Sequence, residues 1–176
     1  MERVEIVKWN KISLAILDKK DINEWYKWLN NIETNLYLWN NKDIYYKENI
    51  EDLYEEKIKE KNSVYFSIYN KENKSVIWIC AIESISDLTL KAELYLFLYD
   101  KNNHNKWYWK EALNLLIDYW FNILWLNKLW LSYIEWNENA EKLYSKSWFK
   151  EVWRFKNDIF VRWKIKDLIF MEIYKN

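Results

Sequence analysis

The sequence predicts a single α/β (α+β) domain in which a mixed, mostly antiparallel sheet of about seven strands is flanked by about four helices. Three strand-like runs with short polar turns between them predict an antiparallel meander. A later succession of strand, helix and strand predicts a crossover and hence one parallel pair. With 176 residues, of which 51% are hydrophobic, the chain can build one core, so we expect one domain spanning residues 1–176.

The first elements follow from their hydrophobic periodicity. Alternating polar and apolar residues from Lys11 to Leu17 predict the first strand. Apolar residues then recur every three or four positions at 22–29, and again from 50 to about 62, which predicts two amphipathic helices. The remaining elements predicted in the same way are strands at 64–69, 75–85 and 90–99, a helix at 109–124, a strand at 128–134, a helix at 137–146, and closing strands at 152–161 and 165–173.

Charge and cysteine content restrict the function classes. Lys plus Arg and Asp plus Glu number 27 each, so no global basic field favours nucleic acid or an anionic membrane. The only cysteine, Cys80, rules out an internal disulfide and is expected to be buried in a strand. No apolar run of about 18 residues and no signal peptide is evident, so we expect a cytoplasmic protein.

Glycine and tryptophan usage is abnormal. The chain has no glycine and no proline but 14 tryptophans, whereas average usage predicts roughly 12 glycines and about two tryptophans. We hypothesise that UGA codons mean glycine in the source and have been read as tryptophan, which would be an alternative genetic code. In-frame TGG codons at Trp107 and Trp148 would contradict this hypothesis.

The segment from His104 to Ala112 joins a predicted strand to a predicted helix. Read with glycine at 107 and 109, it resembles the phosphate-binding turn of the GNAT acetyltransferase superfamily, in which Arg or Gln, two spacers, Gly, one spacer, and Gly or Ala precede a helix. Glycine suits this turn because backbone N–H groups at a helix N-terminus must approach the pyrophosphate of coenzyme A. His104 stands at the Arg/Gln position and departs from the pattern.

A downstream segment strengthens the resemblance. The residues that match the family pattern there are Asn137, Ala140, Leu143, Tyr144, Trp148 and Phe149. Residue 148 follows the predicted helix, where a left-handed C-terminal cap favours glycine. The resemblance covers most of the chain and is closest to the branch of ribosomal-protein N-terminal acetyltransferases and polyamine acetyltransferases.

Nine tryptophans stand where that branch often has glycine: residues 9, 39, 78, 107, 109, 125, 148, 153 and 163. Trp28 is not one of these positions, and we expect it to be a true tryptophan. Aromatic residues at helical or strand spacing usually belong to the core, but Trp107 and Trp109 lie two apart in a polar turn, which burial does not explain. Base stacking by interleaved aromatics is disfavoured by the balanced charge.

The resemblance implies acetyl-CoA as cosubstrate and no metal. It also implies that the acyl-CoA lies along residues 94–99 with its pyrophosphate at 105–110. The implied cofactor-binding residues are Leu96, Phe97, Leu98, His104, Asn105, Lys106, Trp107, Tyr108, Trp109, Lys110 and Asn137. Asn137 would bond the coenzyme or the neighbouring strand end. As written, Trp107 and Trp109 are expected to obstruct the pyrophosphate.

The implied reaction is direct attack of a primary amine on the thioester. Tyr144 is the family-matched acid for the departing thiolate, or else it packs against the coenzyme. Glu93 is our candidate for the base or the amine-binding carboxylate, with Glu83 and Glu135 as rivals; all three could instead be solvated charges at strand edges. Asp167 is expected to be structural.

The acceptor is left open as a protein N-terminus or a small amine such as a polyamine. Acidic residues of the second helix could attract either, although a solvated helix face explains them as well: Glu48, Glu51, Asp52, Glu55 and Glu56. Two other classes remain, an inactive acyl-CoA sensor and a structural partner-binding domain. We expect a monomer or homodimer.

Overall fold

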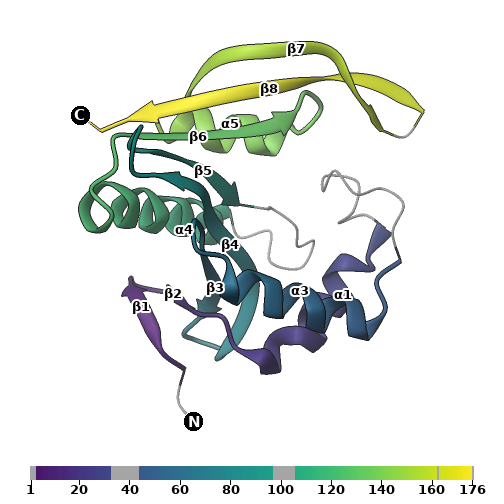
Figure 1. The fold of residues 1–176 in the computed structure, drawn as a ribbon, viewed down its shortest axis with the longest axis vertical. Coiled ribbons are helices and arrows are strands. Elements are labelled where there is room, and N and C mark those ends of the chain that lie inside the picture. The colour runs from purple at the N-terminus through teal and green to yellow at the C-terminus, as the bar shows by residue number, and fades with distance from the viewer. Residues whose placement is uncertain (1–2, 33–43, 97–105, 162, 176) are drawn as a thin grey trace.

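A computed structural model describes residues 3–32, 44–96, 106–161 and 163–175 of the chain. Within these ranges eight strands form one sheet in the order β1-β2-β3-β4-β5-β6-β8-β7, in which only the β5–β6 pair is parallel (Figure 1). The strands are β1 (Glu5–Lys8), β2 (Ile12–Ile16), β3 (Val64–Asn70), β4 (Ser75–Ser86), β5 (Lys91–Leu96), β6 (Lys128–Ile134), β7 (Lys150–Val161) and β8 (Lys164–Tyr174). The predicted mixed, mostly antiparallel sheet is confirmed.

Strand β1 is the one strand that the sequence did not predict. It pairs antiparallel with β2, from Glu5 opposite Ala15 to Lys8 opposite Ser13. Its residues alternate between half-buried and exposed, because the strand lies at the edge of the sheet. The strand has only four residues and alternates weakly, so its pattern cannot be recognised in the sequence.

Four α-helices lie in the described ranges, as predicted, together with shorter helical turns. They are α1 (Ile22–Leu29), α3 (Lys47–Lys59), α4 (Lys106–Asp118) and α5 (Glu138–Lys146), with a 3-10 turn at Lys19–Asp21 and a π-helical turn at Tyr119–Ile123. Helix α4 starts three residues before the predicted start at residue 109, because an uninterrupted aromatic run at 107–109 has no helical spacing of its own.

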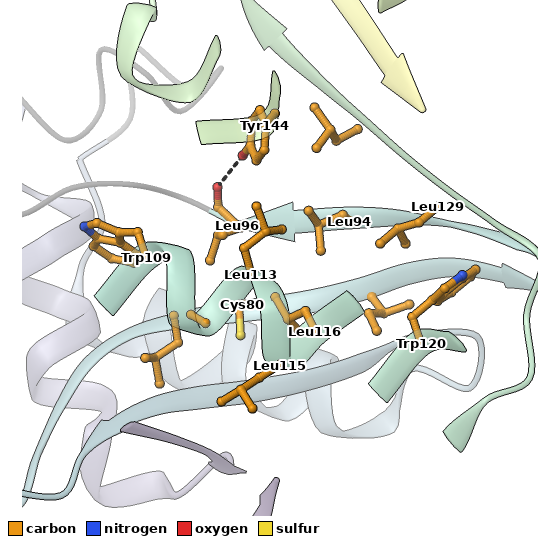
Figure 2. Close-up of a cluster of buried hydrophobic side chains, with 14 of the residues drawn as sticks. Cys80, Leu94, Leu96, Trp109, Leu113, Leu115, Leu116, Trp120, Leu129 and Tyr144 are labelled. Atoms are coloured by element: carbon orange, nitrogen blue, oxygen red, sulfur yellow. Dashed lines mark hydrogen bonds between the residues drawn. The ribbon is translucent and has the colours of Figure 1, made fainter. Parts of the chain in front are cut away.

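The helices form two packing layers. Helices α4 and α5 pack into the main core, where Leu113 and Leu116 lie against sheet residues such as Cys80 and Leu94 (Figure 2). Helices α1 and α3 lie side by side and contact one another (Figure 1). They close a second cluster around Trp25. Cys80 is fully buried, as predicted.

The long β7–β8 hairpin is held by Asp167. Its carboxylate accepts a hydrogen bond from the backbone N–H of Asn157 at 2.9 Å and one from Arg154 at 3.4 Å. These bonds lower the pKa of Asp167. The structural role predicted for Asp167 is confirmed.

Three tryptophans adopt left-handed backbone conformations. The φ angles of Trp125, Trp148 and Trp163 are 54°, 71° and 63°, and their side chains are 74%, 82% and 91% exposed. Trp148 follows α5, and the N–H of Phe149 donates to the Tyr144 carbonyl at 3.1 Å. This bond spans six residues and is the closing bond of a left-handed helix cap, which confirms the predicted conformation at residue 148.

Candidate active site

Strands β5 and β6 separate in the middle of the sheet. Their parallel pairing covers three residue pairs and ends at Glu93 opposite Trp130. Beyond that point β5 continues to Leu96 beside β4, while β6 continues to Ile134 beside β8. The backbone of Leu94–Leu96 therefore faces an opening between two strands instead of a ladder partner, and an extended ligand can pair with a strand edge of this kind.

Tyr144 lies at this opening. Its phenol, carried by α5, donates a hydrogen bond to the Leu96 carbonyl at 3.0 Å (Figure 2). The residue is 4% exposed, and burial, together with the neighbouring Tyr133, raises the pKa of the phenol. Tyr144 is therefore a protonated, positioned O–H group at neutral pH.

The start of α5 fixes where Tyr144 points. Asn137 caps the helix, because its side-chain oxygen accepts a hydrogen bond from the backbone N–H of Ala140 at 3.1 Å. Ala140, Tyr144 and Phe149 all belong to the main core. Asn137 thus has a structural task in the described chain, and its predicted contact with the coenzyme stays a prediction.

Glu93 and Glu83 lie opposite one another on neighbouring antiparallel strands. Side chains of such a pair project from the same face of the sheet with Cβ atoms about 4.5–5.5 Å apart. Burial first, and then the charge of Glu83, raise the pKa of Glu93 to about 7. A carboxyl with a pKa near 7 suits proton exchange at neutral pH.

Tyr65 connects Glu83 to α3 and to the loop that follows it. The Tyr65 Oη atom lies 2.6 Å from Glu83 Oε1 and 2.7 Å from Glu60 Oε2, and it accepts a hydrogen bond from Lys57 Nζ at 2.8 Å. Sequence reasoning missed this group, because only the strand register brings Tyr65 close to Glu83. Alternation along β3 and β4 is the signal that could have found it.

The third carboxylate candidate lies elsewhere. Glu135 follows β6 and forms ion pairs with Arg154 at 3.7 Å and with Lys166 at 3.8 Å. Those partners belong to the β7–β8 hairpin. The structure therefore brings together Glu93 and Glu83, and it leaves Glu135 with the hairpin.

The predicted phosphate turn is only partly described. Phe97, Leu98, His104 and Asn105 lie outside the described residues, and so do the side chains of Lys106 and Trp107. The backbone of those last two residues opens α4, so a helix N-terminus lies where the turn was predicted.

Three further residues of the turn are placed by α4. Lys110 is exposed, whereas Tyr108 is buried and its hydroxyl accepts a hydrogen bond from Asn70 Nδ2 at 3.3 Å. The Trp109 side chain is 8% exposed and packs in the main core. This differs from the expectation that Trp109 obstructs the turn, because the helical period places residue 109 on the same face as Ala112, Leu113 and Leu116.

The described ranges contain neither a metal-binding cluster nor a membrane-spanning helix. No three His, Cys, Asp or Glu side chains there lie close enough together to hold a metal ion. None of the helices in the described part of the chain is long and apolar enough to span a membrane.

Comparison with known families decides the assignment. The profile of a family described as an acetyltransferase (GNAT) domain matches residues 11–150. The chain belongs to the GNAT acetyltransferase family. As a GNAT protein it is by family an acetyl-CoA-dependent acyltransferase, and the resemblance seen in the sequence is confirmed.

Solved structures share the GNAT fold. A spermidine N-acetyltransferase from Vibrio cholerae, solved with CoA and spermine, has a TM-score of 0.84 at 22% identity, covering 93% of this chain and 95% of that one. A probable acetyltransferase has a TM-score of 0.80 at 19% identity, with 96% of each chain covered. A dodecameric form of the Vibrio cholerae enzyme reaches 0.78 at 22% identity, covering 93% and 94%. No curated protein matches the sequence.

The described residues fit acetyl-CoA, the cosubstrate of GNAT enzymes. The separation of β5 from β6 leaves the backbone of Leu94–Leu96 without a ladder partner on one side. Tyr144 places an O–H group at the end of this opening, and Glu93 lies where the opening begins.

Proposed function

We propose that the protein transfers an acetyl group from acetyl-CoA to a primary amine of a polyamine, with Glu93 as base and Tyr144 as acid. The observation that carries the proposal is the placement of these two groups at opposite ends of the opening between β5 and β6. When bound, acetyl-CoA supplies the acetyl group as a thioester.

The protonation states of the two residues suit these roles. An acceptor amine enters as an ammonium ion with a pKa of about 10 and must lose a proton before its nitrogen can attack. Glu93, with its pKa raised to about 7, is partly ionised at neutral pH and accepts that proton. Tyr144 holds its proton at Oη at neutral pH, because burial raises its pKa. It donates this proton to the departing sulfur as the C–S bond breaks, and the second proton that the attacking nitrogen loses as the amide forms replaces it on Tyr144.

Local charge favours a polycationic acceptor. Glu83 and Glu93 face the same side of the sheet, and an amine with several ammonium groups can interact with both carboxylates. The similar Vibrio cholerae structure is a spermidine N-acetyltransferase in complex with CoA and spermine, which supports the same acceptor class. A protein N-terminus carries one ammonium group and gains less from two carboxylates.

A transfer assay tests the proposed acceptor. The purified chain is incubated with acetyl-CoA and either spermidine or a peptide with a free N-terminus, and acetylated products are measured by mass spectrometry. We expect acetylspermidine and at most a trace of acetylated peptide. Preference for the peptide would replace the polyamine by a protein acceptor, and binding of acetyl-CoA with transfer to neither amine would indicate a sensor.

We also propose that glycine is the native residue at Trp125, Trp148 and Trp163. Their left-handed backbone costs a non-glycine residue about 1–2 kcal/mol, and their exposed indoles recover little of that cost through packing. A chain without any glycine, decoded from UGA as tryptophan, accounts for all three positions. TGA codons are expected there, and TGG codons would contradict the proposal.

A further inference from the structure

A polar group beside the proposed base has no part in the reaction described so far. It joins Lys57 at the end of α3, Glu60 just after that helix, Tyr65 on β3 and Glu83 on β4. Lys57 Nζ lies 2.8 Å from the Tyr65 hydroxyl, 3.5 Å from Glu60 and 3.8 Å from Glu83. The Ser63 hydroxyl donates a hydrogen bond to the other carboxylate oxygen of Glu60, Oε1, at 2.7 Å.

The Tyr65 hydroxyl can donate to only one carboxylate at a time, although both lie within hydrogen-bond distance. Glu60 has the Ser63 hydroxyl as a second donor, and this bond is the main cause that lowers the pKa of Glu60. Glu83 has the Tyr65 hydroxyl at 2.6 Å and Lys57 at the longer distance of 3.8 Å. Tyr65 is therefore the closest donor to Glu83 in this group.

Glu83 needs such a tether because regular pairing ends at this residue. The pairing of β4 with β5 is regular up to Glu83 opposite Glu93 and then shifts before Ser86. Ser84 has a left-handed φ of 53°. A side chain at the end of a regular ladder has fewer neighbours to hold its rotamer than one inside it.

Several charged or titratable groups surround Glu93, and Glu83 is the one that acts on it most directly. On its own strand, Lys91 and Tyr95 lie two residues away on the same face. On the neighbouring strand β6, Trp130 lies opposite Glu93. On β8, Glu172 lies opposite Trp130 and forms an ion pair with Lys128. From the helical side, Lys57 at the end of α3 forms an ion pair with Glu83 at 3.8 Å and so acts on Glu93 through Glu83.

We propose that Tyr65, supported by Lys57, is a positioning residue for acetyl transfer: it holds the Glu83 carboxylate against Glu93, so that Glu93 is basic enough to take the proton of the acceptor ammonium. This inference rests on the proposed function. A like charge held opposite a carboxyl disfavours its ionisation and strengthens it as a base. Tyr65 itself touches neither the acceptor nor the thioester in this account.

The test compares three variants of the full chain. Tyr65→Phe removes the donor, Glu83→Gln removes the charge, and Tyr69→Phe deletes the same atom from a tyrosine on the same strand that is outside the group. We expect the rate of transfer to rise with pH as Glu93 ionises, with the wild-type midpoint near pH 7. We expect Tyr65→Phe and Glu83→Gln to move this midpoint to lower pH by about half a unit or more, whereas Tyr69→Phe leaves it unchanged.

A second readout separates this inference from the proposed function. Carboxyl-carbon NMR follows the ionisation of Glu93 without turnover, and the resonance is assigned by its loss in Glu93→Gln. The same shift to lower pH is expected in Tyr65→Phe. If no amine is acetylated, the proposed function fails while this titration still decides the inference. A Glu93 midpoint in Tyr65→Phe that equals the wild-type value, or lies above it, would overturn the positioning role.

Discussion

The hydroxyl of Tyr144 is the residue-scale feature on which the mechanism depends. We expect Tyr144→Phe to lower kcat by about 100-fold or more, the usual range for loss of a general acid, with little change in the KM for acetyl-CoA. Steady-state kinetics with spermidine measures both parameters.

The matched control for this variant is Tyr133→Phe. Tyr133 is also buried in the main core, and its ring lies 6.1 Å from that of Tyr144. If both variants lose activity equally, the loss comes from core packing and not from proton donation. Wild-type kcat in Tyr144→Phe would exclude Tyr144 as the acid.

The resemblance to GNAT enzymes made Tyr144 and Glu93 the site candidates, but it did not predict the setting of Glu93. Glu83 and Glu135 remained rivals of Glu93, because nothing in the chain order indicates which carboxylates share a face. The strand register places Glu83 opposite Glu93 and leaves Glu135 with Arg154. Contacts between elements that lie far apart in the sequence require the fold.

At the scale of elements, the end of α5 keeps a left-handed helix cap although the residue there is tryptophan and not glycine. The helix closes with a left-handed residue at Trp148, although an indole there is 82% exposed. We expect Trp148→Gly to raise the free energy of unfolding by about 1 kcal/mol, measured by urea denaturation of the full chain.

Trp153→Gly is the matched control. Trp153 is another exposed tryptophan at a predicted glycine position, but it lies inside β7 and is not among the left-handed residues. Glycine within a strand is expected to lower the free energy of unfolding by roughly 0.5–1 kcal/mol. Equal effects of the two substitutions would contradict the argument from backbone conformation.

Most elements were predictable because their apolar residues recur with a regular period over enough positions to be recognised. Helix α1 and strand β6 match their predicted bounds, as 22–29 and 128–134. The start of α4 was not predictable, since its first residues carry no apolar period, and neither was its end, where a π-helical turn at Tyr119–Ile123 breaks the regular spacing. Propensity and period describe regular segments, and irregular turns depend on packing.

At the scale of the whole molecule, seven of the nine tryptophans at predicted glycine positions fall into distinct groups, while Trp39 and the side chain of Trp107 lie outside the described residues. Trp125, Trp148 and Trp163 are exposed and left-handed, and Trp9 and Trp153 are exposed in other conformations. Trp78 and Trp109 are buried and fill core volume in this chain. Restored glycine would therefore relieve strain at the surface but would require the core to repack around residues 78 and 109.

Binding of acetyl-CoA in the opening between β5 and β6 can be measured directly by calorimetry. Acetyl-CoA is titrated into the chain as written and into a version with glycine at the nine predicted positions, after circular dichroism has shown that both are folded. We predict one-site binding to the glycine version and weaker binding to the written chain, with Trp107 as the obstruction. Equal binding to both would show that Trp107 does not obstruct the site, and it would leave acetyl-CoA binding in the opening unchallenged. If neither folded version binds acetyl-CoA, the opening between β5 and β6 is not an acetyl-CoA site.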